Sequence, residues 1–102
     1  MDMNKMMKQV QKMQADLMKA QESLADEEVE GTSGGGAVKV TITGGGDFTA
    51  VSIDPAAADA DDPSLLEDLV LAAINDAVRA QRELAEQRLG GLTGGLGIPG
   101  IG

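Results

Sequence analysis

The stretch GGGAVKVTITGGGDFTAVSIDP, residues 34–55, decides how this chain folds. After its first glycine triplet, apolar and polar side chains alternate, which is the period-two pattern of a half-buried β-strand. The apolar face of this strand consists of three β-branched residues, Val38, Val40 and Ile42. The second glycine triplet, residues 44–46, favours a turn, so we expect the strand to lead into another one.

That next strand is predicted over Phe48–Ile53, with Val51 and Ile53 on one face. Phe48 is out of phase with this pair, which indicates a β-bulge or a separate contact for the ring. The Asp-Pro pair that follows ends the strand, because proline has no amide hydrogen to donate to a neighbour. Upstream, Glu28–Thr32 supplies a short edge strand, so the strands within residues 28–54 form a predicted three-stranded antiparallel meander.

On the N-terminal side, residues 1–25 lack glycine and proline and are rich in helix-forming residues. Their apolar side chains alternate at spacings of three and four, the a/d pattern of a helix that packs against another helix. Met7 and Met18 widen this stripe, which leaves a helix facing a globular core as an alternative. The stripe consists of Met3, Met6, Val10, Met13, Leu17, Ala20 and Leu24.

On the C-terminal side, a linker at residues 55–63 leads to a second helix, predicted over 64–89. Ser64 and Glu67 have the spacing of a capping box, in which both side chains satisfy free amide groups at the helix start. The following glycine pair is expected to end the helix. Small alanines in its apolar stripe allow close approach to the first helix or to a second copy. The glycine-rich tail, residues 90–102, is expected to be mobile or to dock in a groove.

Composition excludes several classes of function. The chain has 102 residues, of which 1–89 form one predicted domain, and its 17 acidic and 8 basic side chains give a net charge of −9. Without cysteine or histidine it has no disulfide, zinc finger or imidazole base, so we expect no enzyme. Because the chain has only one aromatic residue, it has little surface on which nucleic-acid bases could stack. Large apolar residues are few, so we expect a partner chain to complete the core. No transmembrane run or signal peptide is found, so we expect a cytoplasmic protein.

The negative charge is unevenly distributed along the chain. Residues 26–63 carry −8 and residues 64–102 carry −2, whereas residues 1–25 carry four lysines against three acidic residues, a net +1. With Met3 at heptad position a, these lysines occupy positions c and f, away from the apolar stripe. They are Lys5, Lys8, Lys12 and Lys19, and together are termed the lysine ridge. The ridge is either the solvated face of an amphipathic helix or a surface that binds phosphates.

The second helix carries three arginines, Arg79, Arg82 and Arg88. Arg82 and Glu86 are four residues apart and are predicted to form an ion pair on the helix surface. Arg79 and Arg82 are secondary candidates for phosphate contact.

Other motifs fail on their context. The glycine triplets lack the Lys-Ser/Thr pair of a phosphate-binding loop and do not lie between a strand and a helix start. Asp59, Asp61 and Asp62 lack the glycine and distal glutamate of a calcium-binding loop. We therefore expect no catalytic residue, metal, cofactor or small-molecule substrate.

Five segments carry a family pattern. In chain order they are NKMMKQVQKMQADLMKAQESL at 4–24, EEVEGTSGGGAVKVTITGGG at 27–46, SIDP at 52–55, LLEDLVLAAINDAVRAQRELAE at 65–86 and LTGGLGIPG at 92–100. Together they resemble the YbaB/EbfC family of bacterial nucleoid-associated proteins. The resemblance implies an α+β chain of order α-β-β-β-α that forms a tweezer-like homodimer, with the sheets at its centre and the helices as arms.

The resemblance also implies binding of double-stranded DNA, with roles in nucleoid organisation, DNA protection and gene expression. Family-like basic residues fall on the lysine ridge, whereas Gly45, Thr49 and Ser52 stand where relatives often carry lysine. The leading hypothesis is therefore a homodimer in the nucleoid that holds duplex DNA mainly through its phosphates. The alternative is a protein-interaction module that binds recombination or replication factors through its apolar helices or tail.

Overall fold

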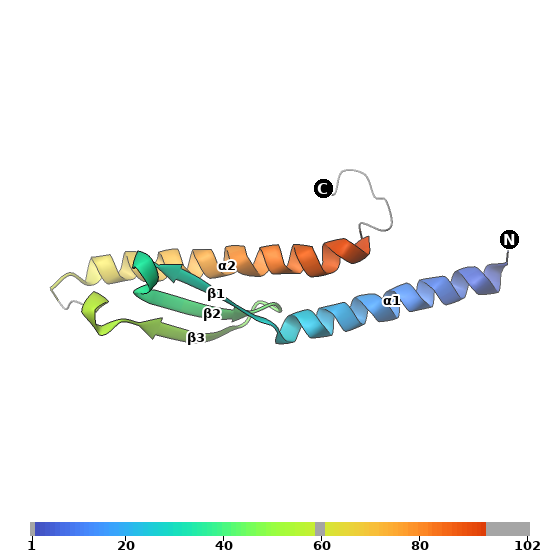
Figure 1. Cartoon of the computed structure of the whole chain (residues 1–102), viewed down its shortest axis with the longest axis horizontal. Helices are drawn as coiled ribbons and strands as arrows, with labels where there is room; N and C mark the ends of the chain where they lie inside the picture. Colours follow the sequence, from blue (N-terminus) through green and yellow to red (C-terminus); the bar gives the residue numbers. More distant parts are fainter. Residues whose placement is uncertain (1, 59–60, 94–102) are drawn as a thin grey trace.

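The computed structural model describes residues 2–58 and 61–93 and has the predicted α-β-β-β-α order (Figure 1). Helix α2 lies along one face of a three-stranded sheet, and helix α1 leaves the sheet edge and projects away from it. The elements are α1 (Met3–Asp26), β1 (Glu28–Ser33), β2 (Val38–Thr43), β3 (Phe48–Ile53) and α2 (Pro63–Thr93), with single 3₁₀ turns at η1 (Gly34–Gly36) and η2 (Pro55–Ala57).

The sheet is the predicted antiparallel meander, with strand order β1-β2-β3. The three glycines of η1 all have positive φ angles, of 60°, 68° and 95°, a region that side chains with a Cβ rarely adopt. In the second turn the Thr43 amide donates to the Asp47 carbonyl at 2.8 Å. Both glycine triplets therefore form turns, as the sequence predicted for the second.

A β-bulge in β3 explains the phase of Phe48. Thr41 pairs with Ala50 whereas Ile42 pairs with Phe48, so Thr49 is the extra residue on the bulged strand. The bulge brings Phe48 onto the sheet face that also carries Val51. The prediction of a bulge is confirmed.

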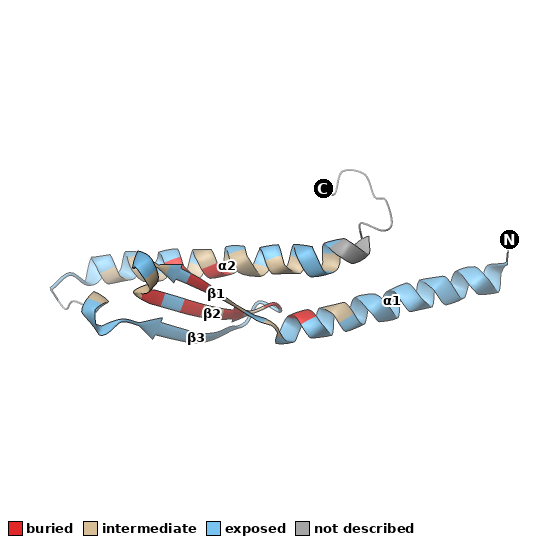
Figure 2. Cartoon of the chain, viewed as in Figure 1, coloured by how far each residue is buried: buried red, intermediate tan, exposed pale blue. Residues whose placement is uncertain are grey.

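The core lies between β2 and the middle of α2 (Figure 2). The predicted inner face of β2 is buried, and Ala73 and Ala77 of α2 cover it. The small side chains of these alanines let α2 approach Gly31 of β1 closely. A Cβ added at Gly31 would overlap backbone atoms of Ala73 and Ala77. Within this chain Ala73 and Ala77 thus approach the sheet and not α1, because a glycine in the strand lets the helix pack directly on the sheet. Approach of the alanines to a second copy stays a prediction.

The N-cap of helix α2 lies two residues before the predicted one. The Asp62 carboxylate accepts hydrogen bonds from the Leu65 amide at 3.2 Å and from the Ser64 hydroxyl at 2.8 Å. Asp62 is thus the N-cap, and Pro63 occupies the first helical position, where its missing amide hydrogen costs nothing. The predicted Ser64–Glu67 capping box is wrong, since Ser64 lies inside the first turn and donates to the true cap.

Helix α2 also continues through the glycine pair and ends at Thr93. A glycine costs about 1 kcal/mol relative to alanine inside a helix, which weakens a helix without stopping it. The predicted end near Leu89 is therefore wrong. The predicted tail, residues 90–102, is therefore helical over 90–93. The rest of it, residues 94–102, lies outside the described part of the chain.

Helix α1 is held to the rest of the fold only at its C-terminal end. Leu24 is buried, and the Gly44 amide donates to the carbonyl of Glu27 at 2.8 Å. Every described side chain of α1 before Ala20 is exposed, so Figure 2 shows this arm almost entirely in the colour of exposed residues. The predicted apolar stripe is present, but among its described residues only Ala20 and Leu24 are not exposed.

Candidate nucleic-acid interface

The lysine ridge lies along the projecting part of α1. Asp2 caps this helix by accepting a hydrogen bond from the Asn4 amide at 3.1 Å. At 100° per residue the four lysines fall within an arc of about 60° and span about 21 Å of the helix axis. All four side chains are exposed. The helix thus presents four cations in one row.

The charges of this row are not neutralised by neighbouring acidic groups. Within residues 2–58 and 61–93, none of the four lysines forms an ion pair or a side-chain hydrogen bond. Asp16 lies on the same helix between Lys12 and Lys19, yet it pairs with neither. The lysine ridge is therefore available to an anion in solution.

Projection of α1 separates the ridge from most of the acidic residues. Lys5 lies about 32 Å along the helix axis from Asp26, where the acidic segment begins. This is several times the Debye length of about 8 Å at physiological salt. The strongly negative net charge is thus screened from the outer part of the arm.

The arginines of α2 differ in their availability. Arg79 is paired on both sides, with Asp76 at 2.9 Å and with Glu83 at 2.9 Å. These two carboxylates raise the pKa of Arg79 above its ordinary value. Arg79 therefore remains charged, but its guanidinium is occupied within its own helix.

Arg82 is exposed and forms no ion pair among the residues that the structure describes. The predicted Arg82–Glu86 pair is therefore wrong. Spacing alone identified one of several possible partners on this helix, and the pair that forms is Arg79–Glu83, with the same i,i+4 separation. Of the two arginine candidates, Arg82 is the one with an unoccupied side chain.

Arg88 joins the two helices at the base of the arm. Its guanidinium donates to both carboxylate oxygens of Glu27, at 2.9 Å and 2.6 Å, just after the end of α1. This bidentate contact lowers the pKa of Glu27 and raises that of Arg88. The two residues are 61 positions apart, so no local spacing rule indicated the pair.

A second surface feature lies on β3. Phe48, Val51 and Ile53 share the sheet face that α2 covers over β2, yet they are 51%, 57% and 38% exposed. Helix α2 packs on β1 and β2 and does not extend over this third strand. The result is an uncovered apolar row beside the core, termed the β3 row.

The described residues define a class of protein: an α+β chain in which one helix covers a small sheet and the other projects as an arm with a row of unpaired lysines. No helix within 2–58 and 61–93 is long and apolar enough to span a membrane. The model of the YbaB/EbfC DNA-binding family matches residues 1–96, so the chain belongs to that family.

Similar proteins cover nearly the whole chain. A nucleoid-associated protein of Pelotomaculum thermopropionicum is 47% identical over 100 residues, which are 98% of this chain and 95% of that protein. A nucleoid-associated protein of Mycobacterium sp. strain KMS is 52% identical over 103 residues, with 98% and 94% covered. The crystal structure of an uncharacterized protein from Helicobacter pylori has the same fold, with a TM-score of 0.71 over 85% of this chain and 91% of that one, at 24% identity.

Proposed function

We propose that this chain binds duplex DNA as a homodimer in the nucleoid, and that the lysine ridge of α1 contacts the phosphates. In this proposal it contributes to nucleoid organisation, in keeping with relatives that are named nucleoid-associated proteins. It also contributes to DNA protection and gene expression, as the family resemblance implies. Arg82 adds a contact from α2, whereas Arg79 has a smaller part because of its two ion pairs. The protein has no catalytic role.

The observation that carries the proposal is the row of four exposed lysines on the projecting helix, which form no ion pair with any described residue. A lysine that is held by a carboxylate must exchange that partner for a phosphate, whereas an unpaired lysine releases counterions from the DNA directly. Few groups on this face are suited to reading base edges, so binding depends on phosphates and on DNA shape.

A homodimer is supported by the β3 row. This row continues the buried face of β2, yet it is exposed in the part of the chain that the structure describes. Two copies that pack these rows together would bury them and would bring two lysine ridges to one particle. Eight phosphate contacts would give a slope of log K against log salt of about −7.

Gel shifts of duplex DNA over a salt series test the proposal with two variants of equal net charge. The first replaces each ridge lysine with glutamine (Lys5→Gln, Lys8→Gln, Lys12→Gln and Lys19→Gln). The matched control replaces four exposed glutamines of the same helix with glutamate (Gln9→Glu, Gln11→Glu, Gln14→Glu and Gln21→Glu). Each set lowers the charge of the chain by four.

We expect the ridge variant to lose most of its affinity and salt dependence, because the cations that displace counterions are gone. The control is expected to bind less tightly than native protein but to keep most of its salt slope. Equal binding by native protein and ridge variant, with both dimeric, would place the DNA site elsewhere. If neither the native protein nor the ridge variant binds DNA, the alternative of a protein-interaction module gains support, because the apolar stripe of α1 is exposed.

A further inference from the structure

The first turns of α1 border a hollow that the DNA-binding proposal does not use. Its volume is about 330 Å³, and the described residues that line it are Met3, Met6, Met7, Val10 and Gln11. Four of these five side chains are apolar, and none is charged. The four apolar ones lie on the opposite side of the helix from the lysine ridge.

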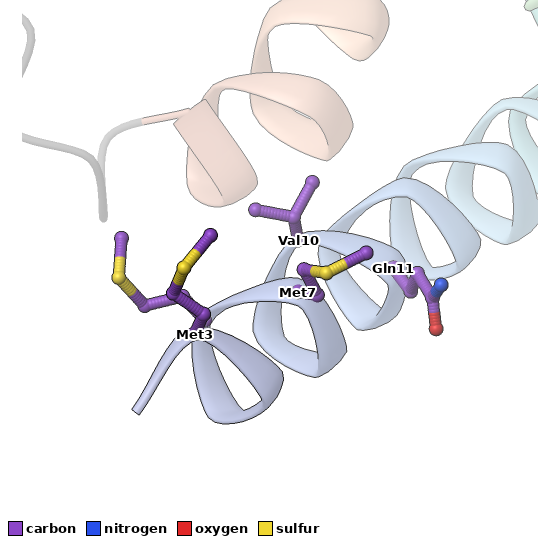
Figure 3. Close-up of a pocket in the computed structure, with 5 residues that line it drawn as sticks. Met3, Met7, Val10 and Gln11 are labelled. Atoms are coloured by element: carbon purple, nitrogen blue, oxygen red, sulfur yellow. The ribbon is translucent and has the colours of Figure 1, made fainter. Parts of the chain in front are cut away.

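The hollow lies on the arm that runs alongside the end of α2. Figure 3 shows Val10 pointing from α1 toward the last turns of α2, and Figure 1 shows the end of α2 alongside the same arm. Helix α2 ends at Thr93, so nine further residues continue from an end of α2 that lies alongside this arm.

These nine residues, 94–102, have the chemistry that the hollow accepts. Their sequence GGLGIPGIG has no charged or polar side chain and carries three large apolar ones, Leu96, Ile98 and Ile101. Nine extended residues reach roughly 30 Å, whereas Met3 and Val10 are about 10 Å apart along the helix. The segment is thus long enough to cross the whole hollow.

We propose that residues 94–102 bind in this methionine-lined hollow of their own chain, with Leu96 and Ile98 against Met3, Met6 and Met7. Methionine side chains are unbranched and adapt to irregular apolar partners, which suits a segment without regular side-chain spacing. The glycines between the apolar residues allow the backbone to lie close to the helix surface. The contact buries apolar area on both partners and leaves the lysine ridge free.

The absence of cysteine allows a direct test on the full chain. A nitroxide label on Gly102→Cys marks the end of the segment, and ¹³C-methyl methionine reports on the hollow by NMR. One variant replaces the apolar residues (Leu96→Ser, Ile98→Ser and Ile101→Ser). The matched control adds the same three hydroxyls at glycines (Gly94→Ser, Gly97→Ser and Gly100→Ser) and keeps the apolar residues.

We expect the label to remove most of the Met3, Met6 and Met7 methyl intensity in native protein and in the glycine control, and to leave Met18 little changed. Replacement of the apolar residues should restore the three signals and shift them. The proposal would be overturned if the label broadened the three methionine signals equally in the apolar-residue variant and in the glycine control. That result would reflect proximity of the segment without docking. A mixture of labelled chains without ¹³C and unlabelled chains with ¹³C distinguishes the source of the segment. Broadening in that mixture would assign the hollow to a second copy and contradict docking within one chain.

Discussion

Gly31 holds strand β1 directly against the backbone of α2. A Cβ at this position would overlap the Ala77 amide and the Ala73 carbonyl, which are helix backbone atoms and have no freedom to move aside. We therefore expect Gly31→Ala to destabilise the fold by about 3 kcal/mol or more, because the helix must shift off the sheet. Chemical denaturation monitored by circular dichroism measures this loss.

Gly90→Ala makes the same chemical change in a different setting. Nothing lies within 4 Å of a Cβ added at Gly90, which is in the last turns of α2. The substitution should raise stability by about 0.5–1 kcal/mol, because alanine loses less backbone entropy than glycine in a helix. If both alanine variants had similar small effects, the close packing inferred at Gly31 would be incorrect.

Asp76 makes the stability of the fold depend on pH. The Thr32 amide donates to its carboxylate at 2.9 Å, and this bond and Arg79 hold the pKa of Asp76 below its ordinary value of 3.8. A carboxyl group with a lower pKa in the folded state stabilises the fold above its unfolded pKa and loses that contribution as the pH falls through the folded pKa. Stability should therefore decline as the pH falls below 3.8, with Glu27 adding a similar loss from its ordinary value of 4.5.

Asp76→Asn separates the charge of this group from its hydrogen bond, since asparagine keeps an oxygen that accepts from Thr32. We expect the variant to have a lower melting temperature than native protein at neutral pH and a difference that shrinks in acid. A gap that stays constant down to pH values well below 3.8 would show that the carboxylate does not titrate as inferred.

At the scale of elements, the start of α2 distinguishes two capping residues. Asp62→Ala should cost about 1 kcal/mol, because the Leu65 amide loses its acceptor. Ser64→Ala should cost only a few tenths of a kcal/mol, since the Ser64 hydroxyl only donates to the Asp62 carboxylate. Thermal unfolding of the two variants decides between them, and a larger loss for Ser64→Ala would restore the capping box that the sequence predicted.

Local patterns predicted the elements well because their causes are local. Alternation placed the buried face of β2, and the phase of Phe48 indicated the bulge that brings it beside Val51. The cap of α2 was misplaced because Asp62 and Ser64 are both good capping residues and only backbone geometry chooses between them. Alternating apolar spacing predicted the stripe of α1, but no spacing states whether a partner covers it.

The candidate site was predicted less completely, because the ion pairs of its arginines depend on tertiary contacts. The lysine ridge followed from helical periodicity alone, and its four lysines share one exposed face. The ion pairs that occupy Arg79 involve Asp76, whose position is also fixed by Thr32 on β1. Likewise Arg88 reaches Glu27 only because the fold brings the end of α1 beside α2.

At the scale of the whole molecule, the single chain is too extended to bury its apolar surface. Its radius of gyration is 19.5 Å, whereas a compact domain of this length has about 13 Å. Its accessible surface is 7338 Å², against about 5400 Å² for a folded monomer of the same mass. The excess is consistent with a chain that completes its core with a second copy.

Val51 on the β3 row provides the test of this dimer. A charge placed there would be buried without a partner if two rows pack together, so Val51→Glu should convert the dimer to monomer in light scattering coupled to gel filtration. Ser52→Glu is the matched control, because Ser52 pairs with Lys39 and faces the other side of the sheet. It should leave the dimer intact.

Since each monomer then carries one lysine ridge, Val51→Glu should also roughly halve the salt slope of DNA binding, from about −7 to about −3.6. A monomeric variant that kept the full slope would mean that one chain alone makes all the phosphate contacts.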